Sequence, residues 1–294
     1  MSILIDKSTR VICQGLTGST ASRMIERAIA DGTKMVGGIT PGKGGTSHLY
    51  LPVFNSVKQA VEEVKPDASA VFVPPAHAAI AIIEAIEAEI PLIVCVTERT
   101  PVLDMVRVRH ALNGSRSLLV GPNSQGVISP GKCRIGVMPD RPHTPGKIGI
   151  ISRSATLAYE AVNQTSELHL GQSTSIGIGG DPVHGLGFVE CLKLFFEDPE
   201  TEGVIMIGEI GGTDEEEAAD YLKQASSTKP VIAYIAGVHA PTWRRMGHAG
   251  TVDVAGSATA TDKINALRDA GAQIIDDPSL MGQTMRKTLQ LIRR

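Results

Sequence analysis

The chain alternates short apolar runs with longer stretches in which apolar residues recur every three or four positions. In the first half, the apolar runs fall at residues 11–14, 35–39, 68–73, 92–97 and 118–121. The amphipathic stretches between them fall at residues 20–31, 55–64, 77–87 and 101–112. Strands that alternate with helices of about ten residues are typical of βαβ units and a parallel sheet.

A second series with the same alternation follows. Its predicted strands are residues 147–151, 173–178, 204–207 and 231–235. Its predicted helices are residues 155–167, 186–196, 214–225, 260–270 and 278–293. The segment between the two series is rich in proline and glycine and has few helix formers, which is typical of a linker with ordered turns. The pattern therefore predicts an α/β protein with two doubly wound, mainly parallel sheets, in domains 1–122 and 147–294 joined by a linker at 123–146.

Composition and charge narrow the class of protein. A length of 294 residues suits two domains, and 42% hydrophobic residues can fill their cores. Only 3% of residues are aromatic and the net charge is -3, which argues against a nucleic-acid partner. With no secretory signal and no apolar run of roughly 20 residues, we expect no membrane partner and a cytoplasmic location, or a mitochondrial-type matrix after processing. The four cysteines are far apart, so we expect free thiols, a reducing compartment and no metal site.

A glycine loop follows the first predicted strand. Gly15 and Gly18 precede a helix, where a Rossmann-type sheet binds phosphate, although a tight strand–helix turn also explains this G-x-x-G spacing. The second strand is not followed by the acidic residue that an NAD ribose needs; Lys43 stands there on a glycine-rich turn. A lysine suits a phosphorylated adenosine such as CoA or NADP, and a solvated lysine is the alternative.

The second domain contains a possible site for phosphate chemistry. Ser154 begins a helix after a strand, which makes either an anion site or an ordinary N-cap. Glu209 ends an apolar strand, at the edge where it could orient an imidazole. His248 lies between Gly247 and Gly250, so it is either a nucleophile toward phosphorus on a pliable loop or a histidine on a solvent loop. Because the chain has no Walker A motif, we expect it not to bind a nucleoside triphosphate alone.

Motifs along almost the whole chain resemble those of the ADP/GDP-forming acyl-CoA synthetase family, and within it the α subunits of succinyl-CoA synthetases. They include "QGLTGS", "GGITPGKGGTSHLYLPVFNSV", "GPNSQGVISPGKCRIG", "PGKIGIISRSATLAYEAV", "TEGVIMIGEIGG" and "RRMGHAG", in the order of the family. The resemblance implies an N-terminal Rossmann-like CoA-binding domain followed by a flavodoxin-like ligase domain. It implies an acid–thiol ligase in which His248 is phosphorylated and Glu209 orients it.

The resemblance also assigns the binding residues. Those that match the CoA site are Thr17, Gly18, Ser19, Thr20, Lys43, Val96, Thr97 and Glu98. Those at the helix start that holds the phosphate are Ser154, Ala155 and Thr156. Tyr159 matches the acid-substrate site, and Asn123 and Ser124 fall near the same expected pocket. The partner implied is a β subunit whose ATP-grasp domain binds ATP or GTP with Mg²⁺, in an αβ or α2β2 assembly.

The chain departs from the family pattern at three places. It has "TGSTASRM" for "TGSQGTFH", "GPNSQG" for "GPNCPG", and Ala155 and Ala158 where relatives have Gly and Thr. The last two departures fall near the expected acid pocket, so succinate is the default acid and malate, citrate and sulfoacetate are alternatives. Two other classes stay open. One is an NADP-dependent oxidoreductase that uses Lys43 for the 2′-phosphate; the other is a non-catalytic CoA-binding regulator.

Overall fold

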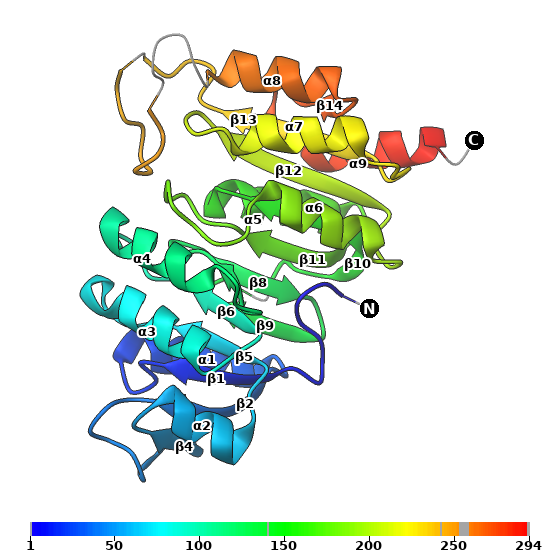
Figure 1. Cartoon of the computed structure of the whole chain (residues 1–294). Helices are drawn as coiled ribbons and strands as arrows, with labels where there is room; N and C mark the ends of the chain where they lie inside the picture. The colour runs from blue at the N-terminus through cyan, green and yellow to red at the C-terminus, as the bar shows by residue number, and fades with distance from the viewer. Residues whose placement is uncertain (1, 140, 242, 253–258, 293–294) are drawn as a thin grey trace. The chain divides into compact units, whose positions relative to one another are not determined.

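The computed structural model describes residues 2–139, 141–241, 243–252 and 259–292 (Figure 1). The chain forms two compact units. The N-terminal unit consists of Leu4–Asp140 and Val183–Gly185, and the C-terminal unit consists of Met1–Ile3, Arg141–Pro182 and Leu186–Arg294. Within the described ranges, every helix is too short or too polar to cross a bilayer.

The N-terminal unit is built on a mainly parallel sheet. Its strands are β1 (Arg10–Gln14), β2 (Lys34–Ile39), β3 (Ser47–His48), β4 (Leu51–Phe54), β5 (Ala68–Val71), β6 (Leu92–Cys95) and β7 (Leu118–Val120). They follow the order β3-β4-β2-β1-β5-β6-β7, and only the short β3 pairs antiparallel. Without β3, this is the strand order of the Rossmann fold. The predicted fold class of this domain is confirmed.

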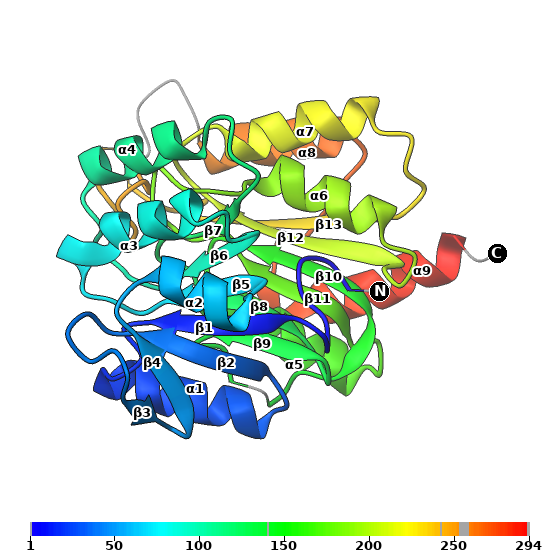
Figure 2. The same ribbon diagram turned by 60° about the horizontal axis from the view of Figure 1, so that its bottom comes forward.

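Helices cover both faces of this sheet. They are α1 (Ser19–Ala30), α2 (Val57–Val64), α3 (Pro75–Glu87) and α4 (Val102–Leu112). Successive residues of a strand face opposite sides, so Ile12 packs with α2, α3 and α4 whereas Cys13 packs with α1. Figure 2 shows α1 and α2 on opposite sides of β1 and β2. Burial on both faces explains why these strands are continuous apolar runs.

The segment predicted as a linker contains an antiparallel hairpin, β8 (Gly126–Ser129) and β9 (Cys133–Gly136), which belongs to the N-terminal unit. Gly126 has a φ of +106°, and a Cβ there would lie 2.1 Å from the carbonyl oxygen of Ile135. The close backbone approach therefore requires glycine, and glycine is what obscured the strands in the sequence. The buried side chain of Arg134 ties the hairpin to the rest of the unit through an ion pair with Asp31.

The C-terminal unit is built on a second parallel sheet. Its strands are β10 (Pro145–Ser152), β11 (Gln172–Gly177), β12 (Gly203–Glu209), β13 (Val231–Ala236) and β14 (Gln273–Ile274). Its helices are α5 (Ala155–Glu167), α6 (Phe188–Glu197), α7 (Asp214–Gln224), α8 (Ala260–Asp269), the 3₁₀ turn Pro278–Leu280 and α9 (Met281–Ile292). Within the unit the strands follow the order β14-β13-β12-β10-β11. This is the flavodoxin-like order, which confirms the predicted fold class of the second domain.

The helices of the C-terminal unit also form two layers. α5 and α9 pack on one face, around a core that includes Ile150, Ile207 and Met285. α6, α7 and α8 lie together on the other face (Figure 1). In both units the strand order reverses beside the first strand, next to β1 in one sheet and next to β10 in the other. Ligands of open α/β sheets bind at the carboxyl ends of the strands at such switch points.

All four cysteines lie inside the protein as free thiols. They are Cys13, Cys95, Cys133 and Cys191. Burial raises the pKa of Cys133 to about 12 and raises the pKa values of Cys13 and Cys191 further. These three thiols therefore remain protonated at neutral pH.

Candidate active site

The C-terminal unit pairs a histidine with a buried glutamate. Glu209 is the last residue of β12, and His248 lies on the loop that follows β13. The His248 Nδ1 atom lies 2.9 Å and 3.0 Å from the two carboxylate oxygens of Glu209. A carboxylate that accepts the Nδ1–H fixes the tautomer in which Nε2 carries the lone pair. The side chain of His248 is 31% exposed, so the imidazole is within reach of a substrate.

The site sits at the switch point of the sheet. β12, which ends in Glu209, pairs directly with β10, which ends in Ser152. The next residue, Arg153, is buried; its Nε donates to Glu209 at 3.2 Å and another of its nitrogens forms an ion pair with Asp214. A guanidinium thus neutralises the buried carboxylates beside the imidazole. The sequence analysis gave Arg153 no role of its own; its position at the end of a strand was the available signal.

The electrostatics of the pair favour a charged imidazole. The hydrogen bond that His248 donates to Glu209 raises the pKa of His248 above its ordinary value, while burial and Arg153 oppose that rise. The carboxylate of Asp181 adds to it. The neutral form that can act as a nucleophile therefore requires a higher pH than an isolated histidine would.

Gly180 packs against the flat face of the His248 ring. A Cβ added at Gly180 would lie 2.3 Å from Nδ1 and 2.4 Å from Cγ of His248. Only glycine at this position leaves room for the imidazole beside Glu209. The signal in the sequence was the Gly179-Gly180-Asp181 turn just beyond β11, which sequence reasoning did not use.

Substituting Gly180 with alanine is expected to push the imidazole away from Glu209. We expect the phosphorylation that the resemblance implies at His248 to slow by about 100-fold, the effect of misplacing a reacting group by roughly 1 Å. The matched control is Gly250→Ala on the same loop, where a new Cβ would meet Pro182 no closer than 3.6 Å. Rapid-quench measurement of phosphoenzyme formation distinguishes the two variants. Equal rates for Gly180→Ala and the unmodified protein would show that the ring does not depend on this contact.

The start of α5 faces the same edge of the sheet. Ser154 is the N-cap; its hydroxyl accepts the N–H of Leu157, and its own N–H donates to the Ser152 hydroxyl. Ala155 and Thr156 are exposed, at the helix end that carries partial positive charge. This arrangement suits an anion at Ala155 and Thr156 rather than at the hydroxyl of Ser154.

The residues expected near the acid lie in different units. Tyr159 projects from α5 and is exposed, whereas Ala158 is buried against the core of the C-terminal unit. Asn123 and Ser124 belong to the N-terminal unit, just beyond β7, where Ser124 is buried and accepts the N–H of Gly126. Ala158 is buried, so replacing the threonine of the relatives by alanine there changes the packing of the core. Ala155, which replaces a glycine, is the altered residue that is exposed to solvent.

The N-terminal unit gathers the expected CoA residues at the carboxyl edge of its sheet. Lys43 Nζ donates to the Thr17 hydroxyl at 3.2 Å, which joins the loops after β1 and β2. Gly18 is the N-cap of α1 and has no side chain to cap it, so Ser19 and Thr20 begin a helix with an open N-terminus. Lys43 and this helix end together suit phosphate.

The third expected segment lies at the same edge. Val96, Thr97 and Glu98 follow β6, and the Thr97 hydroxyl donates to the carbonyl of Val73 at 2.7 Å. That bond holds the segment against the turn after β5. A contact that sequence reasoning missed is His48, whose Nε2 lies 2.7 Å from the hydroxyl of Ser22 in the first turns of α1. His48 therefore helps to place the start of this helix.

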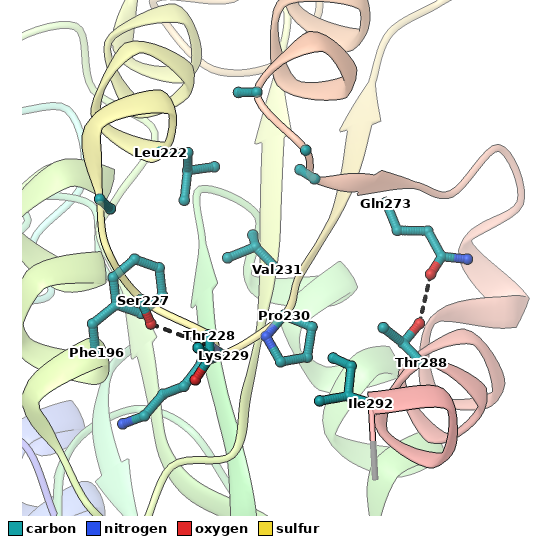
Figure 3. A pocket seen from close by; sticks show the side chains of 14 residues that line it. Phe196, Leu222, Ser227, Thr228, Lys229, Pro230, Val231, Gln273, Thr288 and Ile292 are labelled. Carbon is teal, nitrogen blue, oxygen red and sulfur yellow. Dashed lines mark hydrogen bonds between the residues drawn. The ribbon is translucent and has the colours of Figure 1, made fainter. Parts of the chain in front are cut away.

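Two cavities of the C-terminal unit are lined by described residues other than His248 and Glu209. One of about 360 Å³ is lined by Lys229, Pro230 and Val231 at the amino end of β13 (Figure 3). Its charged lining residue, Lys229, donates to the carbonyl oxygens of Phe195 and Asp198. Another, of about 540 Å³, is lined by Val238 and Met246 from the loop that carries His248, by Ile264 of α8, and by neighbouring residues. Among the residues that the structure places, no cluster of three potential metal ligands occurs.

Comparison with known proteins identifies both units. Residues 6–99 match the family model "CoA binding domain", and residues 151–273 match the family model "CoA-ligase". A succinate–CoA ligase [ADP-forming] subunit alpha from Aquifex aeolicus is 50% identical over 294 residues, covering 99% of this chain and 96% of the relative. One from Staphylococcus epidermidis is 49% identical over 285 residues, covering 97% of this chain and 94% of the relative.

A solved structure with the same fold is ATP citrate lyase from Methanosaeta concilii, in complex with (3S)-citryl-CoA. It aligns with a TM-score of 0.85 at 23% identity over 99% of this chain, which spans about half, 51%, of that protein. The full-length relatives are ligases, which supports the ligase interpretation over the oxidoreductase alternative. This chain belongs to the family of ADP-forming succinate–CoA ligase α subunits, which are acid–thiol ligases.

Proposed function

We propose that this chain is the α subunit of an NDP-forming acid–CoA ligase in which His248 carries a phosphoryl group from the nucleotide to the acid. The observation that carries the proposal is the His248–Glu209 pair at the switch point of the ligase sheet. The carboxylate holds Nδ1, so Nε2 is the nitrogen presented for reaction.

The reaction divides into three transfers. In the first, the Nε2 lone pair attacks the γ-phosphorus, a P–N bond forms, and the bond to the nucleoside diphosphate breaks. In the second, a carboxylate oxygen of the acid takes the phosphoryl group, which restores neutral His248 and gives an acyl phosphate. In the third, the CoA thiolate attacks the acyl carbon and inorganic phosphate leaves. Each step breaks one activated bond, which replaces one difficult reaction with three easier ones.

The binding roles follow from the two sheet edges. Ala155 and Thr156 at the start of α5, with Ser154 as its cap, hold the phosphoryl group during transfer. Thr17, Gly18, Ser19, Thr20 and Lys43 bind the phosphates of CoA, and Val96, Thr97 and Glu98 form a further part of that site. Tyr159, Asn123 and Ser124 contact the acid. His248 supplies the reacting nitrogen, Nε2, and Glu209 orients the imidazole ring.

The nucleotide is bound mainly by a β subunit. The relatives are named as subunits alpha, which implies such a partner. We propose that the partner contributes an ATP-grasp domain that holds ATP or GTP with Mg²⁺, in an αβ or α2β2 assembly. The chain itself supplies the histidine that meets the γ-phosphate.

Succinate is the proposed acid, because the sequence relatives are named succinate–CoA ligases. Malate, citrate and sulfoacetate are the alternatives raised by the altered residues near Tyr159. The test is to purify the chain with its β subunit and measure CoA-dependent ADP release with each acid. We expect kcat/KM for succinate to exceed the others by at least about 100-fold. A higher value for another acid would leave the reaction class intact and reassign the substrate.

A further inference from the structure

A second charged pair lies behind the His248–Glu209 pair and takes no part in the proposed transfers. Glu215, on the first turn of α7, and Lys263, on the first turn of α8, form an ion pair in which both side chains are completely buried. Removing two charges from water is costly, and the attraction between them offsets that cost only with good geometry and further hydrogen bonds. The contacts of the pair are therefore informative.

Glu215 holds the backbone that carries the catalytic glutamate. Its Oε1 atom accepts the backbone N–H of Glu209 at 3.1 Å. The carboxylate also packs against Gly208, where an added Cβ would lie 2.5 Å from the same oxygen. The end of β12 therefore contacts the Glu215 carboxylate through one hydrogen bond, at Glu209, and one close packing contact, at Gly208.

Lys263 holds the next turn of the same segment. Its Nζ donates to the carbonyl oxygen of Gly211 at 2.8 Å, in addition to its contact with Glu215. Gly211 has a φ of +86°, and a Cβ there would lie 2.0 Å from the carbonyl oxygen of Gly250. The backbone at Gly211 therefore supports the loop that carries His248. One buried pair contacts the supports of both members of the catalytic pair.

We propose that Lys263 and Glu215 form a positioning pair that fixes Glu209 and the His248 loop in the geometry needed for phosphoryl transfer. The pair touches no reacting atom and holds the backbone at Glu209 and Gly211. Its other charged neighbours are Arg153, beside Glu215, and Glu216, 3.6 Å from Lys263. This inference rests on the proposed role of His248 as the phosphoryl carrier. A pair that only joined α7 to α8 would contribute to stability and leave the chemistry of His248 unchanged.

The test uses two double variants from which both charges are removed, since a single substitution leaves one buried charge unpaired and destabilises the fold. Lys263→Met with Glu215→Leu removes every polar contact of the pair. Lys263→Met with Glu215→Gln keeps an oxygen that can accept the Glu209 N–H. The control for losing an ion pair outside the site is Arg134→Met, which removes a buried guanidinium from its contact with the half-buried Asp31 in the N-terminal unit.

Three measurements separate positioning from stability. Rapid quench gives the rate of His248 phosphorylation in the complex with the β subunit and ATP. Histidine-selective NMR of the full α chain gives the titration midpoint of His248. Its other charged neighbours, Arg153 and Asp181, stay in place in all variants. Urea unfolding gives the stability of each variant.

We expect the leucine double variant to be phosphorylated about 10- to 100-fold more slowly, the loss typical of removing an outer support from a site. Its His248 midpoint is expected to fall toward that of an ordinary histidine, and the glutamine double variant is expected to lie between it and the unmodified chain. Arg134→Met is expected to lower stability without moving the midpoint. Unmodified rates and midpoints in both double variants would overturn the positioning role.

The NMR arm keeps the two proposals distinguishable. If the unmodified chain accepts no phosphate on His248, the proposed function fails, whereas a shifted midpoint in the double variants still establishes positioning. If the leucine double variant does not fold, the glutamine double variant is compared with Arg134→Met. Rates that fall only in proportion to lost stability, as in that control, would again overturn the positioning role.

Discussion

Replacing His248 with asparagine is expected to abolish the phosphorylated α subunit and to reduce CoA-ligase turnover by about 10⁴-fold or more. Asparagine approximates the Nδ1 donor and can still bond to Glu209, but it lacks the nucleophilic nitrogen at Nε2. Without that atom the phosphoryl group has no carrier, and losses of this size are typical when a catalytic nucleophile is removed. The measurement is transfer of ³²P from γ-labelled ATP to the α chain in the complex, followed by acid and base treatment.

The matched control is His239→Asn, an exposed histidine on the same loop. It is expected to keep the label, which on the unmodified chain should be labile in acid and stable in base, as phosphohistidine is. Label that persists in His248→Asn with those properties would place the carrier at another histidine. Normal turnover without any label on the α chain would instead mean direct transfer from nucleotide to acid.

Replacing Glu209 with glutamine is expected to give the second largest effect. The amide keeps the shape of the side chain but loses the charge that fixes the tautomer of His248 and balances Arg153. Changing a carboxylate that orients a catalytic histidine into an amide lowers rates by about 10²- to 10⁴-fold. Glu217→Gln, on the exposed side of α7, is the control and is expected to have no effect.

The pH profile gives an independent check on this substitution. Because Glu209 raises the pKa of His248, the neutral nucleophile of the unmodified chain is depleted as the pH falls through that raised value. In Glu209→Gln the pKa is expected to return toward about 6.5, so the rising limb of the phosphorylation rate moves to lower pH. The ratio of unmodified to variant rate should therefore be smaller at pH 6 than at pH 8. A limb that moves upward would mean that Glu209 does not raise this pKa.

Much of the fold was predictable because each layer leaves a periodic signal in the chain. Apolar residues at helical spacing marked α5, observed at Ala155–Glu167, and continuous apolar runs marked the buried parallel strands. Strand order was not predictable, because periodicity reports which faces are buried and not which strand is the neighbour. The short strands β3 and β14 contain two residues each, too few to show any alternation.

The candidate site was predictable only where sheet geometry applies. Glu209 ends a strand and His248 lies between glycines on a loop. Because sites of parallel sheets form at the carboxyl ends of the strands, these two residues could be predicted to act together. Gly180 and Lys263 escaped notice for different reasons. The role of Gly180 is a steric contact with a residue 68 positions away. No pattern in the sequence marks Lys263 on α8 as buried, and the structure shows that it is.

The buried cysteines have a consequence for a protein that handles a thiol substrate. CoA and its oxidised disulfide exchange with protein thiols only when a thiolate is accessible. Here the thiols are enclosed, and that of Cys133 has a pKa of about 12, so exchange with them is suppressed. The reactive thiol is therefore that of CoA, and the buried cysteines of this chain are protected from forming mixed disulfides with it.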